Sequence, residues 1–300
     1  RSVHMKKVVH FFTRYQWILL VSYVFVLSVL YGALSIVRHM HFQSGGFDLG
    51  LYDQAVWRFS QFLDPFNTIK GRIIFGDHLV LTLPLLGPFL YLWNDVRMLL
   101  VLQAVAIGVS AIPIYFIALK RTASVFASWV VMVLYSLFFG IQFGVFFDFH
   151  PIILGVSFLC FLSWAIEYHR KTLFWIFFVL CVLTQENMGI AVMCLGCVYI
   201  FRREHRKMAV FLIVSGIAYT FISLKIISSL SPIGYEYKAT IPLSISQVLI
   251  KLFDSEEKRL TWLYSYSWFS FLPIFSLGSV MAVVADLSQY YVTGVAYSRM

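Results

Sequence analysis

Long apolar runs separated by short polar segments dominate the pattern of the chain. The first run, Tyr15–Val37, is long enough for a transmembrane helix, which needs about 20 mostly apolar residues. Further apolar runs follow, and from their number we expect about eight transmembrane helices. They are Arg97–Leu119, Ala123–Phe143, Ile152–Ile166, Leu173–Thr184, Met188–Phe201, Met208–Leu230 and Leu260–Val284. The pattern therefore predicts an all-α polytopic membrane protein.

Two longer polar stretches, residues 38–96 and 231–259, interrupt these runs. In the first, Leu49–Leu63 is amphipathic at helical spacing, and Leu79–Trp93 is apolar but broken by two prolines. Because both are too short or too interrupted to span, we expect two helices that lie at the membrane interface. In the second stretch, Ile245–Phe253 predicts another interfacial helix.

Composition supports a membrane environment and argues against nucleic acid as a partner. Hydrophobic residues make up 60% of the chain and charged residues 12%, with a mean hydropathy of +0.83. A soluble domain carries about twice that share of charge, so the expected partner is the lipid bilayer. The net charge of +9 does not indicate nucleic-acid binding, because the basic residues form short clusters between apolar runs.

The distribution of basic residues predicts the orientation of the chain. Twelve of the 23 Lys and Arg residues fall in the N-terminal segment and in every second loop between the expected helices. These segments hold only two carboxylates, Glu167 and Glu204. By the positive-inside rule these loops and residues 1–14 are cytoplasmic. Residues 38–96 and 231–259 then face outward. We expect a single membrane domain over residues 1–300, and a longer parent protein, because the chain stops at Met300 without an end signal.

One acidic residue, Glu186, is expected inside the membrane. The hairpin formed by residues 172–201 has 30 residues, whereas two full spans need about 40. Its turn, Gln185-Glu186-Asn187, should therefore lie within the outer half of the bilayer. A carboxylate at that depth is costly unless it faces a cavity, which makes Glu186 a candidate site residue. The alternative is an interfacial helix cap.

Other acidic and imidazole groups lie at expected helix ends on the same side. Asp48 stands between glycines at the start of the amphipathic helix, where it could also be an N-cap, and Asp53 follows it. The Asp77-His78 pair precedes the proline-broken segment. Asp148-x-His150 places two metal-ligand types within chelating reach. If these groups converge with Glu186 at the outer opening of one cavity, they could act as a general base or bind a divalent cation. The alternative is a set of separate caps and solvated loop residues.

Four motifs carry a family resemblance. Phe47-Asp48-Leu49-Gly50-x-Tyr52-Asp53-Gln54, Gly76-Asp77-His78, Phe147-Asp148-Phe149-His150-Pro151 and Gln185-Glu186-Asn187, in this order, resemble the predicted membrane proteins of domain of unknown function 2079 (DUF2079). The resemblance covers about residues 45–200. The acidic pair that is usual in the family appears here as Glu186-Asn187.

The layout more distantly resembles the GT-C superfamily of glycosyltransferases, which use lipid-phosphate-linked sugars. This resemblance implies a transferase of a prokaryotic cell membrane, with its active site facing outward and a polyprenyl-phosphate sugar as donor. Asp48 would activate an acceptor of unknown identity, with Glu186 as a second catalytic residue. Asp148 and His150 would stand at a site for Mg or Mn. The residues expected to bind substrate are Asp53, Gln54, Asp77, His78 and Asn187.

Such a reaction also needs a cation to stabilise the leaving phosphate. The outer-side candidates are Lys70, Arg72, Arg97, Lys238, Lys258 and Arg259. Two other functions remain open at this point. One is a transporter or flippase with an intramembrane carboxylate relay, and the other is a non-catalytic subunit of an envelope-assembly complex.

Overall fold

The structure is a computed structural model that describes residues 14–237 and 244–292. The expected cytoplasmic residues 1–13 and the candidate cation Lys238 lie outside this described part. By its internal contacts the chain divides into two compact units. Unit 1 comprises Arg1–Gly71 and Leu81–Thr184, and unit 2 comprises Arg72–Val80 and Gln185–Met300.

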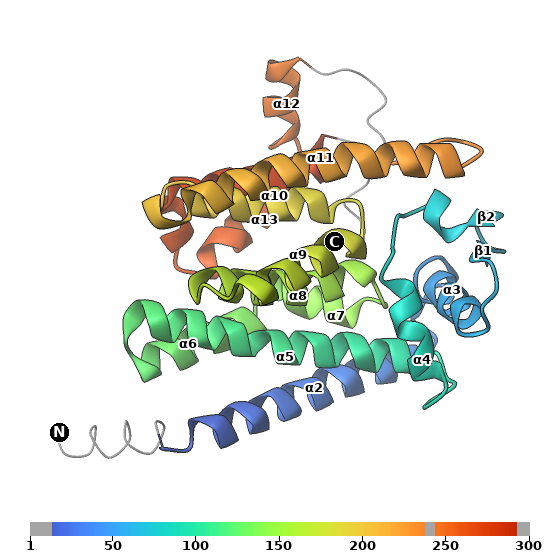
Figure 1. The fold of residues 1–300 in the computed structure, drawn as a ribbon, viewed down its shortest axis with the longest axis horizontal. Helices are drawn as coiled ribbons and strands as arrows, with labels where there is room; N and C mark the ends of the chain where they lie inside the picture. Colours follow the sequence, from blue (N-terminus) through green and yellow to red (C-terminus); the bar gives the residue numbers. More distant parts are fainter. Residues whose placement is uncertain (1–13, 238–243, 293–300) are drawn as a thin grey trace. The chain divides into compact units, whose positions relative to one another are not determined.

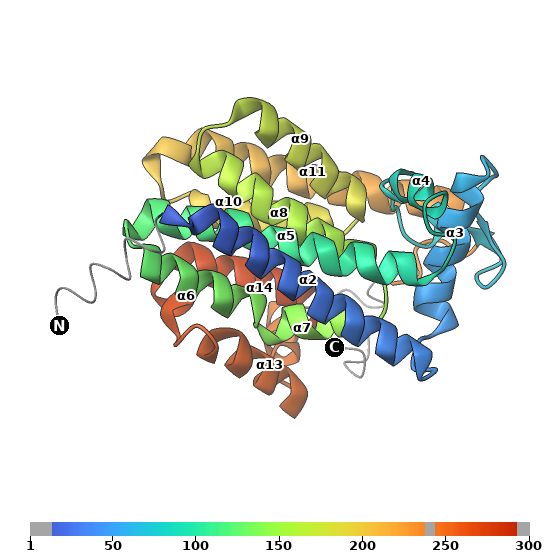
Figure 2. The same cartoon turned by 90° about the horizontal axis from the view of Figure 1, so that it is seen from below.

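Unit 1 is built on helices that pack side by side. The helix α2 packs on α5, α5 also packs on α6 and α8, and α8 packs on α9 (Figures 1 and 2). A buried cluster that includes Leu27, Ile107 and Val145 fills the space between α2, α5 and α7. The helix bounds are Gln16–Met40 for α2, Arg97–Thr122 for α5, Val125–Ser136 for α6, Phe139–Phe146 for α7, Pro151–Glu167 for α8 and Lys171–Thr184 for α9.

Short elements fill the stretch of unit 1 between α2 and α5. The π-helix η1 (Gly46–Gly50) leads directly into α3 (Leu51–Ser60), which buries Leu51, Tyr52 and Val56 on one face. This confirms a helix in the amphipathic segment 49–63. The second expected helix is reduced to the 3-10 turn η3 (Leu83–Leu86) and the single turn α4 (Gly87–Leu90), each with a proline in its first turn. The strand β1 (Phe66–Asn67) lies between α3 and these turns in the sequence.

Unit 2 combines a short N-terminal piece with the C-terminal helices. The piece holds the strand β2 (Arg72–Ile73) and the 3-10 helix η2 (Ile74–Gly76). The helix α10 packs on α11 and on α14, and a Cβ on Gly216 of α11 would come 2.4 Å from the carbonyl oxygen of Gly189 of α10. The bounds are Met188–Tyr199 for α10, Arg203–His205 for η4, Arg206–Leu230 for α11, Ile245–Lys251 for α12, Glu256–Ser267 for α13, Leu272–Phe275 for η5 and Leu277–Tyr291 for α14.

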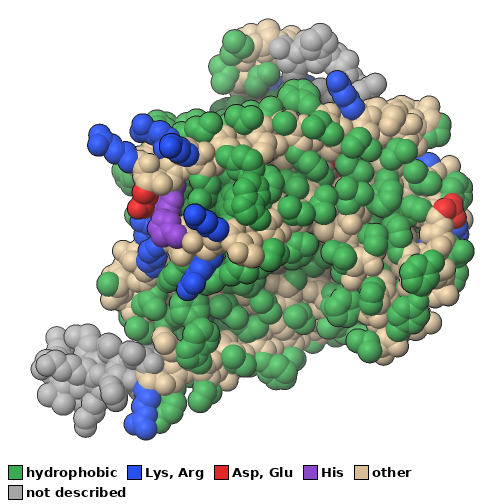
Figure 3. Space-filling model, in the orientation of Figure 1, with side chains coloured by type: hydrophobic (Ala, Val, Ile, Leu, Met, Phe, Trp, Pro, Cys, Tyr) green, Lys and Arg blue, Asp and Glu red, His purple; other side chains and the backbone are tan. Residues whose placement is uncertain are grey.

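The described part of the chain is mostly helical and carries the features of an integral membrane protein, but it has fewer candidate spans than expected. Three helices are long and apolar enough to cross a bilayer, Gln16–Met40, Arg97–Thr122 and Arg203–Leu230, and the bent pair formed by α6 and α7 would make a fourth. The expected count of about eight is not supported. The helices α8, α9 and α10 have only 17, 14 and 12 residues, and α10 is about 18 Å long at 1.5 Å per residue. Hydrophobic side chains cover most of the face visible in Figure 3.

The last apolar run, Leu260–Val284, for which the sequence left open a full span or a turn back, is not one continuous helix. The helix α13 ends at Ser267, and α14 begins only at Leu277. Pro273 lies in the 3-10 turn between them, and Ser270 and Phe271 before it have positive φ values of 52° and 59°. A left-handed pair followed by proline cannot continue an α-helix.

Candidate functional site

The structure gathers the candidate residues into two groups, one in each unit. In unit 1 the first group contains Asp48, Asp148 and His150. In unit 2 the second contains Asp77, His78 and Glu186. The expectation that all of them converge at a single mouth stays a prediction.

The buried carboxylate of Asp148 organises the group in unit 1. Its Oδ1 atom accepts a hydrogen bond from Nη1 of Arg38 at 2.7 Å, and its Oδ2 atom accepts one from the backbone N–H of Gly45 at 2.8 Å. The side chain of Asp148 is 2% exposed and that of Arg38 is 14% exposed. Arg38 also donates to the backbone carbonyl of Phe147. The last turn of α2 is thus joined to the segment before α8.

The side chains of Asp48 and His150 form a partly exposed pair beside this anchor. Asp48 Oδ1 lies 3.2 Å from His150 Nε2, and the two side chains are 26% and 28% exposed. Pro151 is the first residue of α8 and disfavours a helical conformation at the residue before it. His150 is accordingly extended, with φ −131° and ψ 124°. Asp48 lies inside η1, and the N-cap positions of η1 and α3 are Gly45 and Gly50, so Asp48 does not occupy an N-cap position.

A glutamine inside α5 fixes the backbone that carries Asp148 and His150. Gln103 Nε2 donates to the carbonyl of Asp148 at 3.1 Å, and Gln103 Oε1 accepts from the N–H of His150 at 2.8 Å. Gln103 is fully buried. Gln103 and Arg38 are absent from the residues expected at the site. A buried amide within the apolar run 97–119 is the signal that could have found Gln103.

The contacts of Asp148 and His150 do not form a metal-binding arrangement. Asp148 binds Arg38 and Gly45, whereas His150 Nε2 meets Asp48. Within residues 14–237 and 244–292 there is no group of three or more His, Cys, Asp or Glu side chains that could hold a metal ion. As it is arranged, the donor set does not fit Mg or Mn. The metal site stays a prediction.

The two remaining candidates of unit 1 lie on α3. Gln54 accepts a hydrogen bond from the N–H of Thr68 at 2.9 Å and donates to its hydroxyl at 2.9 Å, so it joins α3 to the following loop. Asp53 is half-buried. Burial and then the Asp95 carboxylate raise the pKa of Asp53, and His39 lowers it by less.

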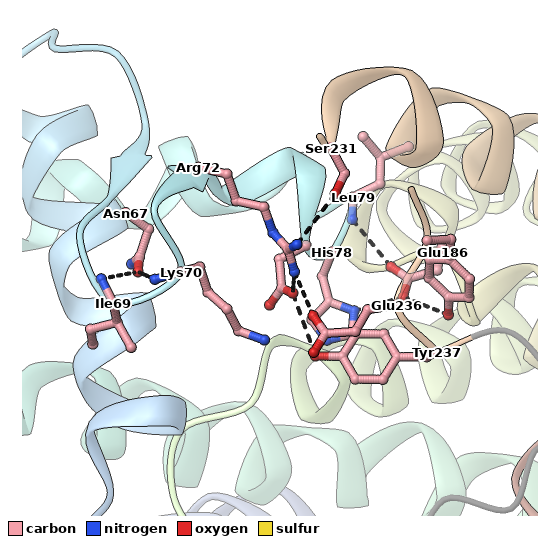
Figure 4. A network of polar contacts seen from close by, with 12 residues as sticks. Asn67, Ile69, Lys70, Arg72, His78, Leu79, Glu186, Ser231, Glu236 and Tyr237 are labelled. Carbon is pink, nitrogen blue, oxygen red and sulfur yellow. Dashed lines mark hydrogen bonds and ion pairs between the residues drawn. The ribbon is translucent and has the colours of Figure 1, made fainter. Parts of the chain in front are cut away.

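In unit 2, Glu186 and His78 form a largely buried ion pair (Figure 4). His78 Nδ1 lies 2.7 Å from Glu186 Oε1, and the N–H of Leu79 donates to Glu186 Oε2 at 3.1 Å. The side chain of Glu186 is 3% exposed and that of His78 is 19% exposed. Burial of the Glu186 carboxyl group opposes its ionisation. His78 and the backbone N–H of Leu79 outweigh this effect and lower the pKa of Glu186 below its usual value.

The segment after α11 supplies side chains that sequence reasoning did not select. The ring of Tyr237 stacks on His78 at a centroid distance of 4.8 Å, and the hydroxyl of Tyr235 lies 3.4 Å from Glu186 Oε1. Glu236 Oε2 accepts from Arg72 Nη2 at 2.6 Å (Figure 4). Tyr235, Glu236 and Tyr237 follow no hydrophobic period and belong to no recognisable motif, so no feature of the sequence selects them.

The flanks of Glu186 hold polar atoms that are buried and have no hydrogen-bond partner among the described residues. These atoms are Gln185 Oε1 and Asn187 Oδ1. Asn187 Nδ2 donates to the hydroxyl of Tyr290 at 3.1 Å. Buried amide oxygens without partners are costly, and a ligand hydroxyl or a water molecule would satisfy them. The group therefore combines a buried carboxylate with acceptors for hydrogen-bond donors.

Comparison with known proteins agrees with the first of the two resemblances. A family model described as a predicted membrane protein (DUF2079) matches residues 38–298. No curated protein matches the chain, and no solved structure matches it. The likeness to the DUF2079 proteins is confirmed, and the likeness to GT-C enzymes stays a prediction.

Proposed function

Since the chain belongs to the DUF2079 family of predicted membrane proteins, we propose that it is a membrane glycosyltransferase of GT-C type. It would move a sugar from a polyprenyl-phosphate donor to an acceptor on the outer side of the membrane. The observation that carries this proposal is the contact of 3.2 Å between Asp48 and His150. A partly exposed carboxylate held by an imidazole has the chemistry of a general base.

The proposed reaction is a single displacement. Asp48 takes the proton from an acceptor hydroxyl or amine, and the acceptor oxygen or nitrogen forms a bond to the anomeric carbon. The bond from that carbon to the phosphate oxygen breaks, and the polyprenyl phosphate leaves with the electron pair. His150 positions the Asp48 carboxylate, and Asp148 with Arg38 holds the backbone from which both groups project.

Two further features support a lipid-linked donor carrying a sugar. An open apolar groove of about 420 Å³ runs between α10, α11, α12 and α14 in unit 2 and offers a surface for a prenyl chain. The amide oxygens of Gln185 and Asn187 and the Glu186 carboxylate offer acceptors for sugar hydroxyl groups. Within this proposal Glu186 is the second catalytic residue, and Asp53, Gln54, Asp77, His78 and Asn187 belong to the substrate-binding set.

The test is an assay of the purified full-length chain with a panel of polyprenyl-phosphate sugars. Asp48→Asn keeps the shape of the side chain but removes the base, so transfer should fall by a factor of about 10² to 10⁴. Asp64→Asn is the matched control, because Asp64 is 66% exposed and pairs with Arg58, six residues earlier in the last turn of α3. Unchanged transfer by Asp48→Asn would overturn the base assignment.

The second candidate function is a transporter or flippase that uses a carboxylate relay. The buried pair of Glu186 and His78 favours it, since a buried carboxylate beside an imidazole can pass a proton. Movement of substrate across reconstituted vesicles without a covalent product would select this function. The third candidate is a non-catalytic subunit of an envelope-assembly complex, which would produce neither product nor movement.

A further inference from the structure

One arginine of unit 2 is buried in contact with two carboxylates of very different exposure. Arg72 Nη2 donates to Asp77 Oδ1 at 2.5 Å and to Glu236 Oε2 at 2.6 Å. The side chains of Arg72 and Asp77 are 6% and 2% exposed, whereas that of Glu236 is 45% exposed. Asp77, five residues away on the same short segment, neutralises the guanidinium. Glu236 is a second anion that comes from the loop after α11.

The guanidinium still has unused hydrogen-bonding capacity. Its Nε atom is buried and has no hydrogen-bond partner among the described residues, and Nη1 reaches only the hydroxyl of Ser231 at 3.3 Å. Arginine presents five N–H donors in a fork that matches phosphate as well as carboxylate. A buried, incompletely bonded guanidinium that holds an exposed carboxylate therefore has the features of an anion site filled by the chain itself.

Two of the other cations that the sequence offered are less suitable. Arg97 is chelated by Asp95, two residues away, at 2.8 and 2.6 Å. Lys258 is bound by Asp254 at 2.6 Å and by the carbonyl of Lys251 at 2.7 Å. The carboxylates that hold these two cations come from two and four residues away, although Lys258 also reaches the carbonyl of Tyr291 at 3.3 Å. Arg72 instead holds a carboxylate 164 residues away.

We propose that Arg72 and Ser231 bind the phosphate group of the polyprenyl-phosphate ligand, and that Glu236 occupies this site in its absence. The choice of a lipid-linked phosphate rests on the proposed function. The phosphate site itself rests on the contacts of Arg72. Binding exchanges one anion for another at Arg72, so the buried pair of Arg72 and Asp77 stays intact. Displacement of Glu236 also releases the neighbouring Tyr237 from His78, which couples phosphate binding to opening of the Glu186 group.

Glu236→Gln is the informative variant, because it removes the competing charge at a half-exposed position. If Glu236 occupies Arg72 about nine-tenths of the time, its removal should raise the affinity for polyprenyl phosphate about tenfold. Arg72→Gln should lower the affinity for polyprenyl phosphate at least about tenfold.

Arg72→Lys keeps the positive charge next to Asp77 and replaces Arg72→Gln in the assay if that variant does not fold. It should bind more weakly than the unchanged chain, since lysine lacks the planar fork. Arg97→Gln is the matched control and should leave affinity unchanged.

Binding is measured on the full chain in detergent, without an acceptor, using polyprenyl phosphate, inorganic phosphate and the neutral polyprenol. The proposal expects polyprenyl phosphate to bind, inorganic phosphate to compete with it, and polyprenol to fail to compete at the same concentration. If inorganic phosphate alone binds as tightly as the lipid, the phosphate site stands and the lipid source is excluded. Unchanged affinity in both Glu236→Gln and Arg72→Lys would overturn the proposal.

The same assay separates this proposal from the proposed function. Asp48→Asn should bind polyprenyl phosphate as well as the unchanged chain does. Phosphate binding that responds to Glu236 and Arg72, in a chain that transfers no sugar, would leave this site standing and refute the glycosyltransferase. If the chain transfers sugar but neither variant changes its affinity for polyprenyl phosphate, the glycosyltransferase stands and the phosphate site at Arg72 is refuted.

Discussion

The Nδ1 atom of His78 lies 2.7 Å from Oε1 of Glu186, although 108 residues separate the two in the sequence. The N–H of Leu79 binds the other oxygen of the same carboxylate. The Asp77-His78 motif and the turn between α9 and α10 thus form one buried unit. This contact lowers the pKa of a carboxyl group whose side chain is only 3% exposed.

We expect Glu186 to make the stability of the protein depend on pH in the acidic range. In the folded state the pKa of Glu186 lies below its ordinary value of 4.5. As the pH falls, the unfolded state therefore binds a proton at Glu186 before the folded state does. Its stabilising contribution is then fully present above about pH 4.5 and declines as the pH drops toward the folded pKa. Unfolding of the detergent-solubilised chain between pH 3 and 7 measures this, and Glu186→Gln should flatten the profile. An equally steep profile in Glu186→Gln would contradict the expectation.

Loss of the Asp148 carboxylate should destabilise unit 1 strongly. Asp148→Asn leaves the guanidinium of Arg38 without its buried counter-charge, and breaking a buried pair typically costs about 3–5 kcal/mol. Thermal unfolding in detergent measures the change. In Asp64→Asn the broken pair is solvent-exposed, and the expected cost is at most about 1 kcal/mol. If Asp148→Asn and Asp64→Asn lost similar amounts of unfolding free energy, Asp148 would not anchor unit 1.

The close approach of α10 and α11 predicts the effect of a single added methyl group. A Cβ on Gly216 would meet the Gly189 carbonyl oxygen at 2.4 Å and the Met193 nitrogen at 2.8 Å, both backbone atoms. Alanine favours a helix over glycine by about 1 kcal/mol, but overpacking costs about 1–3 kcal/mol or more. Gly216→Ala should therefore lower the unfolding temperature. Gly46→Ala, where a Cβ meets nothing within 4 Å, should not, and a stabilised Gly216→Ala would refute the close packing.

The buried amide of Asn67 should determine the loop that follows it. Its Nδ2 atom donates to the carbonyl of Leu51 at 3.0 Å, and its Oδ1 atom accepts from the N–H groups of Ile69 and Lys70 at 3.0 and 3.1 Å (Figure 4). Asn67→Ala leaves these groups without partners, at a cost of roughly 1–3 kcal/mol. Urea unfolding measures it. Gln54→Ala, which loses contacts at an exposed site, should cost less, and the reverse order would contradict this role.

The sequence predicted the helical class because this depends on local signals. Apolar runs of sufficient length marked α2, α5 and α11, and the amphipathic segment marked α3. The Asp148-x-His150 motif was predicted to act as one chelating pair, but its two side chains bind different partners. That outcome depends on Arg38, at the end of a helix 110 residues away. Contacts of this kind follow from tertiary packing, which hydropathy does not encode.

The span count failed for a different physical reason. The expected count included apolar runs of only 12 to 15 residues, and the helices that form there, α8, α9 and α10, have 17, 14 and 12 residues. A span needs about 20. Glu236 and Tyr237 could not be selected from the sequence, since they lie in a loop, where hydrophobic periodicity gives no guidance. The proximity of Glu186 to His78 was expected only as part of a general convergence, and the direct ion pair emerged from the structure.

The amide of Gln103 has a consequence for how the site of unit 1 responds to its surroundings. It holds the backbone of Asp148 and His150 through two hydrogen bonds between uncharged groups, which salt screens far less than ion pairs. Because neither hydrogen bond involves a charged side chain, added salt should weaken the contact between Asp48 and His150 more than it weakens the hold on the backbone of residues 148–150. The position of this segment should therefore depend little on ionic strength.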